Sequence, residues 1–169
     1  DVLAFPLTIT AERKQYVTFT NPHFDTHQVL VQKKPANWRM QAPEMLEKKL
    51  IRQPEQLGGQ EVYVMKGSAF LDRLRELNTQ LQKPILIKED SATAETESLI
   101  QKVATGEIKF TVTDEVIANT NTLYYSNLDI KTVLSEPQQI AWAVRTNSPQ
   151  LQTEINAWLA KTKKSGVFR

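Results

Sequence analysis

Strand-like and helix-like patterns alternate along the chain from residue 61 onward. Short apolar segments bounded by glycine, proline or polar residues predict buried strands at 61–65, 84–87 and 108–112. Apolar side chains at three- and four-residue spacing predict helices after Ser68, over 95–104 and over 114–124. Because strands and helices take turns, the pattern is typical of an α/β lobe built on a largely parallel sheet.

Two extended apolar segments, at 28–32 and 139–144, flank this α/β region. Ser148 and Pro149 then begin a terminal helix with a cap and a first-turn proline in their preferred places. The apolar stripe of this helix consists of Leu151, Ile155, Trp158 and Leu159, and Gly166 is expected to end it. The stretch 33–60 is polar and proline-punctuated. It contains a helical patch at 44–51, whose apolar residues Met45, Leu46, Leu50 and Ile51 could cover the α/β lobe.

Composition narrows the function classes. The 169 residues include 21 Lys and Arg, 19 Asp and Glu, and no cysteine, so disulfides and thiolate chemistry are excluded. The net charge of +2 is not gathered in a basic block, and no apolar run reaches membrane-spanning length, so nucleic-acid and membrane-surface partners have little support. His23 and His27 are four residues apart, but Pro22 precedes them and no third ligand is near, so no metal site is predicted.

The residues around Thr8 and Arg13 are the first candidate binding site. Thr8 is expected at a transition from strand to helix, and Arg13 follows in the short helix, so its guanidinium can fold back toward the helix N-terminus. Free amides, the positive end of a helix dipole and a forked cation together can receive a carboxylate. The alternative is a helix capped by Thr10 with a solvated Arg13, and these residues alone favour it.

Ser68 and Asp114 are the second and third candidates. Each is expected where a strand ends and a helix begins, which is where ligands meet the carboxyl edge of an α/β sheet. Ser68, with Gly67 and Ala69, could offer free amides to an anion, and Asp114 could accept a hydrogen bond from a ligand ammonium. Simple helix capping explains Ser68 about equally well. For Asp114 both roles are compatible, because one oxygen can cap the helix while the other accepts from the ligand.

Several of these motifs resemble one family. The run Leu-Thr-Ile-Thr-Ala-Glu-Arg at 7–13, followed by Val-Thr-Phe-Thr-Asn-Pro-His-Phe at 17–24, is similar to the signature of the amino-acid-type periplasmic solute-binding proteins. The segments 62–68, 106–114 and 140–145 keep the same register, so the resemblance covers nearly the whole chain. It implies a type-II periplasmic binding fold with two lobes joined by a hinge.

The resemblance also implies a division of the chain. Lobe 1 would contain 1–32 and 140–169, including the hinge strands, and lobe 2 would contain 33–139, with an insertion at about 33–60. In the family, further elements precede the Leu-Thr-Ile-Thr motif, so lobe 1 is expected to be truncated at its N-terminus.

Within the family, segments 124–130 and 142–149 resemble most the regulatory domain of the membrane-bound lytic murein transglycosylases of type F. This likeness implies a sensor domain that binds an amino-acid-like or peptidoglycan-peptide ligand between its lobes. The full-length protein would be a periplasmic lytic transglycosylase with a catalytic domain outside this chain, associated with peptidoglycan and the outer membrane. The alternative is the amino-acid-binding component of an ABC uptake transporter.

The resemblance also suggests which residues contact the ligand. Arg13 and Thr8 from one lobe, and Asp114 and Ser68 from the other, would hold its charged ends. The remaining expected pocket residues are Phe5, Pro6, Met65, Ala69 and Phe70. Phe5, Pro6 and Phe70 stand where amino-acid binders carry polar residues, which suggests a larger and less polar pocket, better suited to a peptide terminus.

No catalytic machinery is predicted within the chain. Glu97 and Ser98 resemble the Glu-Ser pair around the catalytic acid of lytic transglycosylases, but they fall in an amphipathic helix whose Leu99 and Ile100 point inward. Glu97 is therefore expected to be a solvated residue, because a catalytic acid needs a raised pKa inside a sugar-binding groove. No nucleophile, phosphate-binding loop or cofactor site is indicated, so a binding module is the preferred interpretation.

Overall fold

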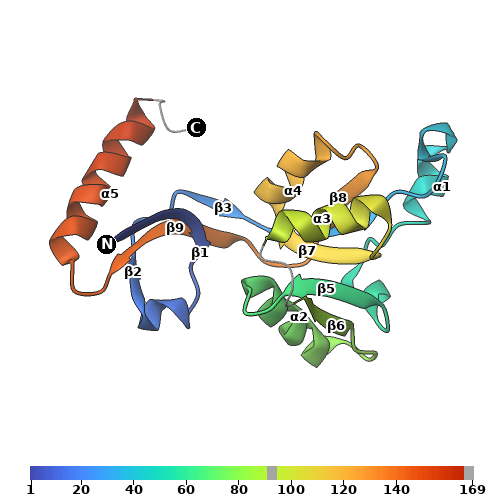
Figure 1. The fold of residues 1–169 in the computed structure, drawn as a ribbon, viewed down its shortest axis with the longest axis horizontal. Coiled ribbons are helices and arrows are strands. Elements are labelled where there is room, and N and C mark those ends of the chain that lie inside the picture. The colour runs from blue at the N-terminus through green and yellow to red at the C-terminus, as the bar shows by residue number, and fades with distance from the viewer. Residues whose placement is uncertain (91–94, 166–169) are drawn as a thin grey trace. The chain divides into compact units, whose positions relative to one another are not determined.

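The computed structural model describes residues 1–90 and 95–165, and it divides the chain into two compact units (Figure 1). Unit 1 consists of Asp1–Thr26 and Pro137–Arg169, and unit 2 is the continuous segment His27–Glu136. Each unit has its own sheet and its own helices, which confirms the predicted α/β class.

The sheet of unit 1 is organised around one long strand, β9 (Gln138–Arg145). Three N-terminal strands pair with it in antiparallel fashion: β1 (Val2–Thr8), β2 (Val17–Phe19) and β3 (Phe24–Thr26). The register of β1 shifts between Leu3 and Leu7, where Pro6 lacks a backbone donor for the ladder. The 3₁₀ helix η1 (Arg13–Gln15) lies between β1 and β2.

The terminal helix α5 (Pro149–Lys164) packs within unit 1. Leu159 is buried, and Trp158 is stacked with Trp142 of β9 at 6.0 Å between ring centroids. Three α5 side chains hydrogen-bond the backbone of residues 19–23: Gln152 with Phe19 O, Asn156 with Asn21 N, and Lys163 with both Pro22 O and His23 O. The predicted helix is therefore confirmed, while Gly166, its expected end, lies outside the described residues.

The sheet of unit 2 has five strands in the order β6-β5-β7-β4-β8. The strand β5 (Glu61–Met65) is parallel to both β6 (Leu86–Asp90) and β7 (Phe110–Asp114). The strand β4 (Gln28–Lys33) is antiparallel to both β7 and β8 (Leu128–Val133). The segment 28–32, which the family resemblance assigns to the hinge, is thus an inner strand of this sheet.

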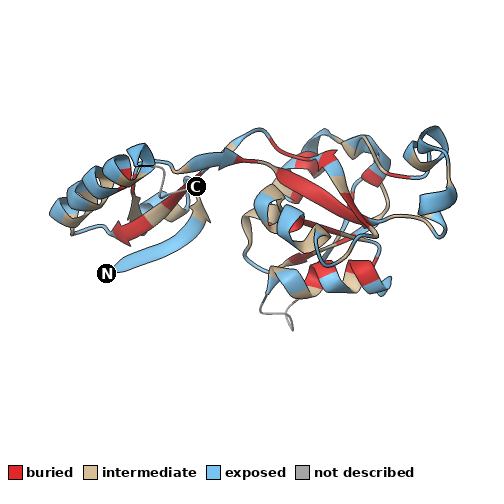
Figure 2. Cartoon of the chain, turned by 90° about the horizontal axis from the view of Figure 1, so that it is seen from above, coloured by how far each residue is buried: buried red, intermediate tan, exposed pale blue. Residues whose placement is uncertain are grey.

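Helices cover both faces of this sheet. On one face, α2 (Ala69–Gln80) packs Leu71, Leu74 and Leu77 against a cluster that includes Val62 and Val64. On the other, α3 (Thr96–Thr105) and α4 (Glu115–Thr122) pack against the alternate residues of the strands, including Val29 and Val31. Figure 2 shows buried residues along the strands between these helices. The strands are therefore held between two apolar layers, which keeps the ends of the strands in place.

Two strands begin two residues later than the hydrophobic pattern predicts. Before β6, the amide side chain of Asn78 bonds both the N–H and the carbonyl of Ile85, at 2.7 and 3.1 Å, so Ile85 is held outside the ladder. Before β7, the N–H of Ile108 turns back to the carbonyl of Lys102. Gly106, with a φ of 92°, ends α3 there, so the buried Ile108 completes a helix C-cap instead of a strand.

The segment 33–60 contains three short helices: η2 (Trp38–Met40), α1 (Pro43–Glu47) and η3 (Pro54–Leu57). Leu50 and Leu57 are buried, whereas Met45 is 51% exposed, so only part of the expected apolar set covers unit 2. Among the described residues, no helix has both the length and the apolar character that a membrane crossing needs.

Candidate functional site

Arg13 folds back toward the end of β1. Its Nη1 donates a hydrogen bond to the Thr8 carbonyl at 3.0 Å, and its backbone N–H donates to Thr10 Oγ1 at 3.2 Å. Thr10 therefore accepts a backbone bond from the first residue of η1, as the capping interpretation expects, although the N-cap position itself is Glu12. The guanidinium returns to Thr8, and its role as a carboxylate receptor stays a prediction. The Thr8 contact is a carbonyl oxygen rather than amides, and the helix is one 3₁₀ turn. This contact uses one of the five guanidinium donors.

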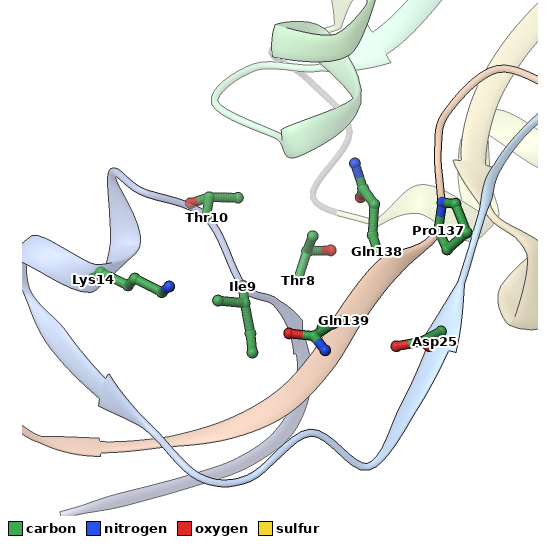
Figure 3. Close-up of a pocket in the computed structure, with 8 residues that line it drawn as sticks. All are labelled: Thr8, Ile9, Thr10, Lys14, Asp25, Pro137, Gln138 and Gln139. Carbon is green, nitrogen blue, oxygen red and sulfur yellow. The ribbon is translucent and has the colours of Figure 1, made fainter.

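A hollow of about 520 Å³ lies beside this segment within unit 1. Figure 3 shows Lys14 and Asp25 extending toward it from opposite sides, so a cation and an anion flank the same space. The other lining residues are Thr8, Ile9, Thr10, Pro137, Gln138 and Gln139. Phe5 and Pro6 are exposed and do not line this hollow.

Ser68 caps α2 at the carboxyl end of β5. Its Oγ accepts the N–H of Leu71 at 3.3 Å and donates to the carbonyl of Met65 at 2.8 Å. Gly67, with a φ of 70°, takes the left-handed conformation that lets the chain turn from the strand into the helix. Ala69 is the first residue of α2, while Met65 and Phe70 are half-buried and pack against the two apolar clusters of unit 2.

Asp114 occupies the matching position at the end of β7. Its Oδ1 accepts the N–H of Val116 at 2.9 Å and so caps α4. The capping role proposed for Ser68 and Asp114 is thereby confirmed, and a ligand role for either remains a prediction.

Gln28 lies beside both Asp114 and the start of α2. It faces Asp114 in the register of β4 and β7, and its Nε2 donates to the carbonyl of Ala69 at 3.4 Å. Gln28 is 1% exposed, although a glutamine beginning a strand carries no burial signal in the sequence. Because β5 and β7 are parallel neighbours, the N-termini of α2 and α4 lie along one edge of the sheet.

The two histidines are in separate environments. In unit 1, the Nε2 of His23 accepts the N–H of Trp142 at 3.0 Å, and burial together with the nearby Lys163 ammonium lowers the pKa of His23. In unit 2, His27 Nδ1 lies 3.4 Å from a Glu115 carboxylate oxygen. The described part of the chain contains no group of three or more His, Cys, Asp or Glu arranged to hold a metal ion. Glu97 is exposed on α3, as predicted.

The α/β architecture places helix N-termini at the carboxyl ends of parallel strands, which is where α/β proteins commonly bind ligands. Residues 1–169 match the bacterial extracellular solute-binding proteins, family 3, and the chain belongs to this family.

Curated relatives show which members of the family this chain resembles. The chain is 30% identical over 169 residues to the membrane-bound lytic murein transglycosylase F of Desulfosudis oleivorans, covering 99% of this chain and 34% of the relative. It is also 30% identical over 166 residues to the protein of the same name from Methylobacillus flagellatus, covering 98% and 32%. The chain thus spans about a third of the length of these relatives. The predicted resemblance is confirmed.

Solved structures agree on the fold. A mutant of ArgBP from T. maritima superposes with a TM-score of 0.75 at 25% identity, covering 96% of this chain and 62% of that one. A structure reported for glutathione import through GshT of Streptococcus mutans gives 0.78 at 19% identity, covering 96% and 63%, and supports the fold alone. The type-II periplasmic binding fold predicted from the sequence is confirmed.

Proposed function

We propose that this solute-binding domain holds an amino-acid-like ligand, with a cell-wall peptide terminus as the preferred candidate. The observation that carries the proposal is the shared sheet edge in unit 2, where Ser68 and Asp114 cap neighbouring helices. A helix N-terminus favours a carboxylate, and a carboxylate side chain favours an ammonium. One edge therefore offers partners for both ends of a zwitterion.

Unit 1 carries candidate ligand contacts of its own. Arg13 keeps guanidinium donors beyond the one bound to Thr8, and a guanidinium matches a carboxylate in a forked geometry. The hollow between Lys14 and Asp25 adds a further pair of opposite charges on the same unit. Phe5 and Pro6 of β1 are exposed apolar residues on the same unit, and contacts with them would suit a ligand larger than a free amino acid.

We further propose that the domain acts as the sensor of a transglycosylase F-like protein in the periplasm, beside peptidoglycan and the outer membrane. Ligand binding would draw the two lobes together, and closure would act on a catalytic domain elsewhere in the protein. The support is the 30% identity over 99% of this chain to a transglycosylase F.

The alternative is an uptake component that delivers amino acids to an ABC transporter. It is favoured by the structural likeness to ArgBP at 25% identity. The full-length gene separates the two proposals, because a catalytic domain encoded after this segment supports the sensor and its absence supports the uptake component.

Calorimetry with Asp114→Asn tests the site. Asparagine keeps an oxygen for the Val116 N–H but removes the negative charge, so the unliganded melting temperature should stay nearly constant. A stem dipeptide with a free amino group should bind the variant more weakly than the wild type. Its N-acetylated form, which lacks the ammonium, should bind both proteins equally. An equal loss of affinity for the two peptides would contradict an ammonium contact at Asp114.

A further inference from the structure

A second hollow, of about 400 Å³, lies in unit 2, at the end of the sheet opposite to Ser68 and Asp114. The strand β4 ends there at Lys33 and β7 begins there at Phe110, whereas Ser68 and Asp114 follow the other ends of β5 and β7. The lining residues are Gln32, Lys33, Lys49, Ile51, Gln60, Gly106, Ile108, Lys109 and Phe110. The size is within the range of small-molecule sites.

The lining carries three positive charges and no acidic residue. Lys33 Nζ donates to the carbonyl of Thr105 at 3.0 Å, and Lys49 Nζ donates to Gln41 Oε1 at 3.0 Å. Each ammonium has three donors, so both keep donors for another acceptor. Lys109 is exposed and makes neither a hydrogen bond nor an ion pair with any other described residue.

Three other lysines of unit 2 have a carboxylate nearby, whereas the three in the hollow have none among the described residues. Lys88 lies 3.4 Å from Glu61, Lys102 lies 2.7 Å from Asp90, and Lys131 lies 3.9 Å from Glu47. The hollow therefore gathers lysines that have no carboxylate partner within the described chain. Like charges held together without a counter-charge repel one another, and a bound anion would relieve that repulsion.

The rest of the lining fixes the shape of the hollow. The amide of Gln32 is fully engaged with the backbone of Ile51 and with Asp129, so it forms a rigid wall. Gly106 has a φ of 92°, and a Cβ there would come within 3.0 Å of Lys33 Nζ, so the glycine leaves room for that ammonium. Among the described residues, the side-chain amide of Gln60 has no hydrogen-bond partner, so it can donate to a ligand.

We propose that this hollow, defined by Lys33, Lys49 and Lys109, binds a small anion that carries two or more negative charges. It is a second site, independent of the proposed amino-acid-like ligand. Ile51 and Phe110 restrict water on one side of the ligand, and a less hydrated environment strengthens the attraction between the ammonium groups and the anion.

The test is an NMR titration of the chain with pyrophosphate and with citrate at a constant ionic strength of about 0.15 M. Saturable shifts are expected at the amides of Gly106, Ile108 and Phe110. The double variant Lys49→Ala/Lys109→Ala should weaken binding at least about tenfold, the equivalent of losing roughly one charged contact. Its circular dichroism should match the wild type, because both side chains are exposed.

Two controls make the result specific. Lys161→Ala removes one charge from the exposed surface of α5 in unit 1 and should leave pyrophosphate binding unchanged. Acetate, with a single charge, should give no saturable shift at matched ionic strength. The proposal is overturned if pyrophosphate and citrate give no saturable shift, if acetate saturates equally, or if Lys161→Ala weakens binding as much as the double variant. Binding of the stem dipeptide reports on the other site, so the two proposals fail separately.

Discussion

Asp129→Asn should destabilise unit 2 by removing the charge from a buried ion pair. The carboxylate of Asp129 lies on β8, its side chain is 3% exposed, and Arg52 binds it through both terminal nitrogens, at 2.6 and 3.0 Å. Gln32 Nε2 donates to the same carboxylate at 3.2 Å. The pair joins the segment 33–60 to the sheet, so its loss should lower the free energy of unfolding of the whole unit.

The size of the effect follows from these contacts. Asparagine keeps one acceptor oxygen but turns an NH₂ group toward the second Arg52 nitrogen, so one charge-assisted bond is lost and the other weakened. A hydrogen bond to a charged group contributes about 1.5–3 kcal/mol, and removing one partner of a fully buried pair costs about 3–5 kcal/mol. Because the Arg52 side chain is 22% exposed, water solvates part of its charge. We expect a loss of about 2–4 kcal/mol in the free energy of unfolding of unit 2.

Glu47→Gln is the matched control, since Glu47 binds the same guanidinium from the surface. Its side chain is 45% exposed, and its hydrogen bond with Arg52 lowers the pKa of the Glu47 carboxyl. Solvent screening makes such exposed pairs weak, so this variant should lose much less stability. Native-state hydrogen exchange of the β4 amides reports on unit 2 alone. Equal losses in the two variants would refute the argument that burial decides the value of the pair.

Three further predictions concern single residues. Arg13→Ala should weaken a carboxylate ligand by about 2–5 kcal/mol in calorimetry, with Arg13→Lys recovering only part of the affinity; unchanged binding in the alanine variant would contradict a carboxylate contact. Because the pKa of His23 is lowered in the folded state, the unfolded state takes up the proton first as the pH falls. The stability that neutral His23 contributes is therefore present above the pKa of the unfolded state and is lost as the pH falls through the pKa of the folded state. Protection of the Trp142 amide from hydrogen exchange should therefore decrease below about pH 6.5, and His23→Gln should flatten this dependence. Gly106→Ala should cost about 1–2 kcal/mol in urea unfolding, because its φ of 92° disfavours any Cβ, and no loss would refute the required conformation.

Local signals made part of the candidate site predictable. Ser68 and Asp114 each follow a short apolar strand and precede a helical pattern, and both cap the helices expected there. Thr10 likewise accepts the backbone N–H of Arg13, three residues later. Caps involve residues two to four positions apart, so the sequence contains both partners in one window.

Other parts of the site depend on contacts between distant segments. Lys14 and Gln138 line one hollow only because β1 pairs with β9, which lies more than a hundred residues later. Thr111 and Thr113 are fully buried in β7 although they are polar, and Thr111 satisfies its hydroxyl on the carbonyl of Tyr63. The strands β2 and β3 have three residues each, too few to show an alternating pattern.

The dependence of unit 1 on β9 also sets the order in which the molecule can assemble. Unit 2 is continuous from His27 to Glu136, so all of it is synthesised before β9. The strands β1, β2 and β3 are made before unit 2, and β9, the strand with which all three pair in the described residues, is made after it. Because this pairing spans more than a hundred residues, we expect the sheet of unit 1 to form more slowly than the locally connected sheet of unit 2, and its strand edges stay unpaired until β9 is added.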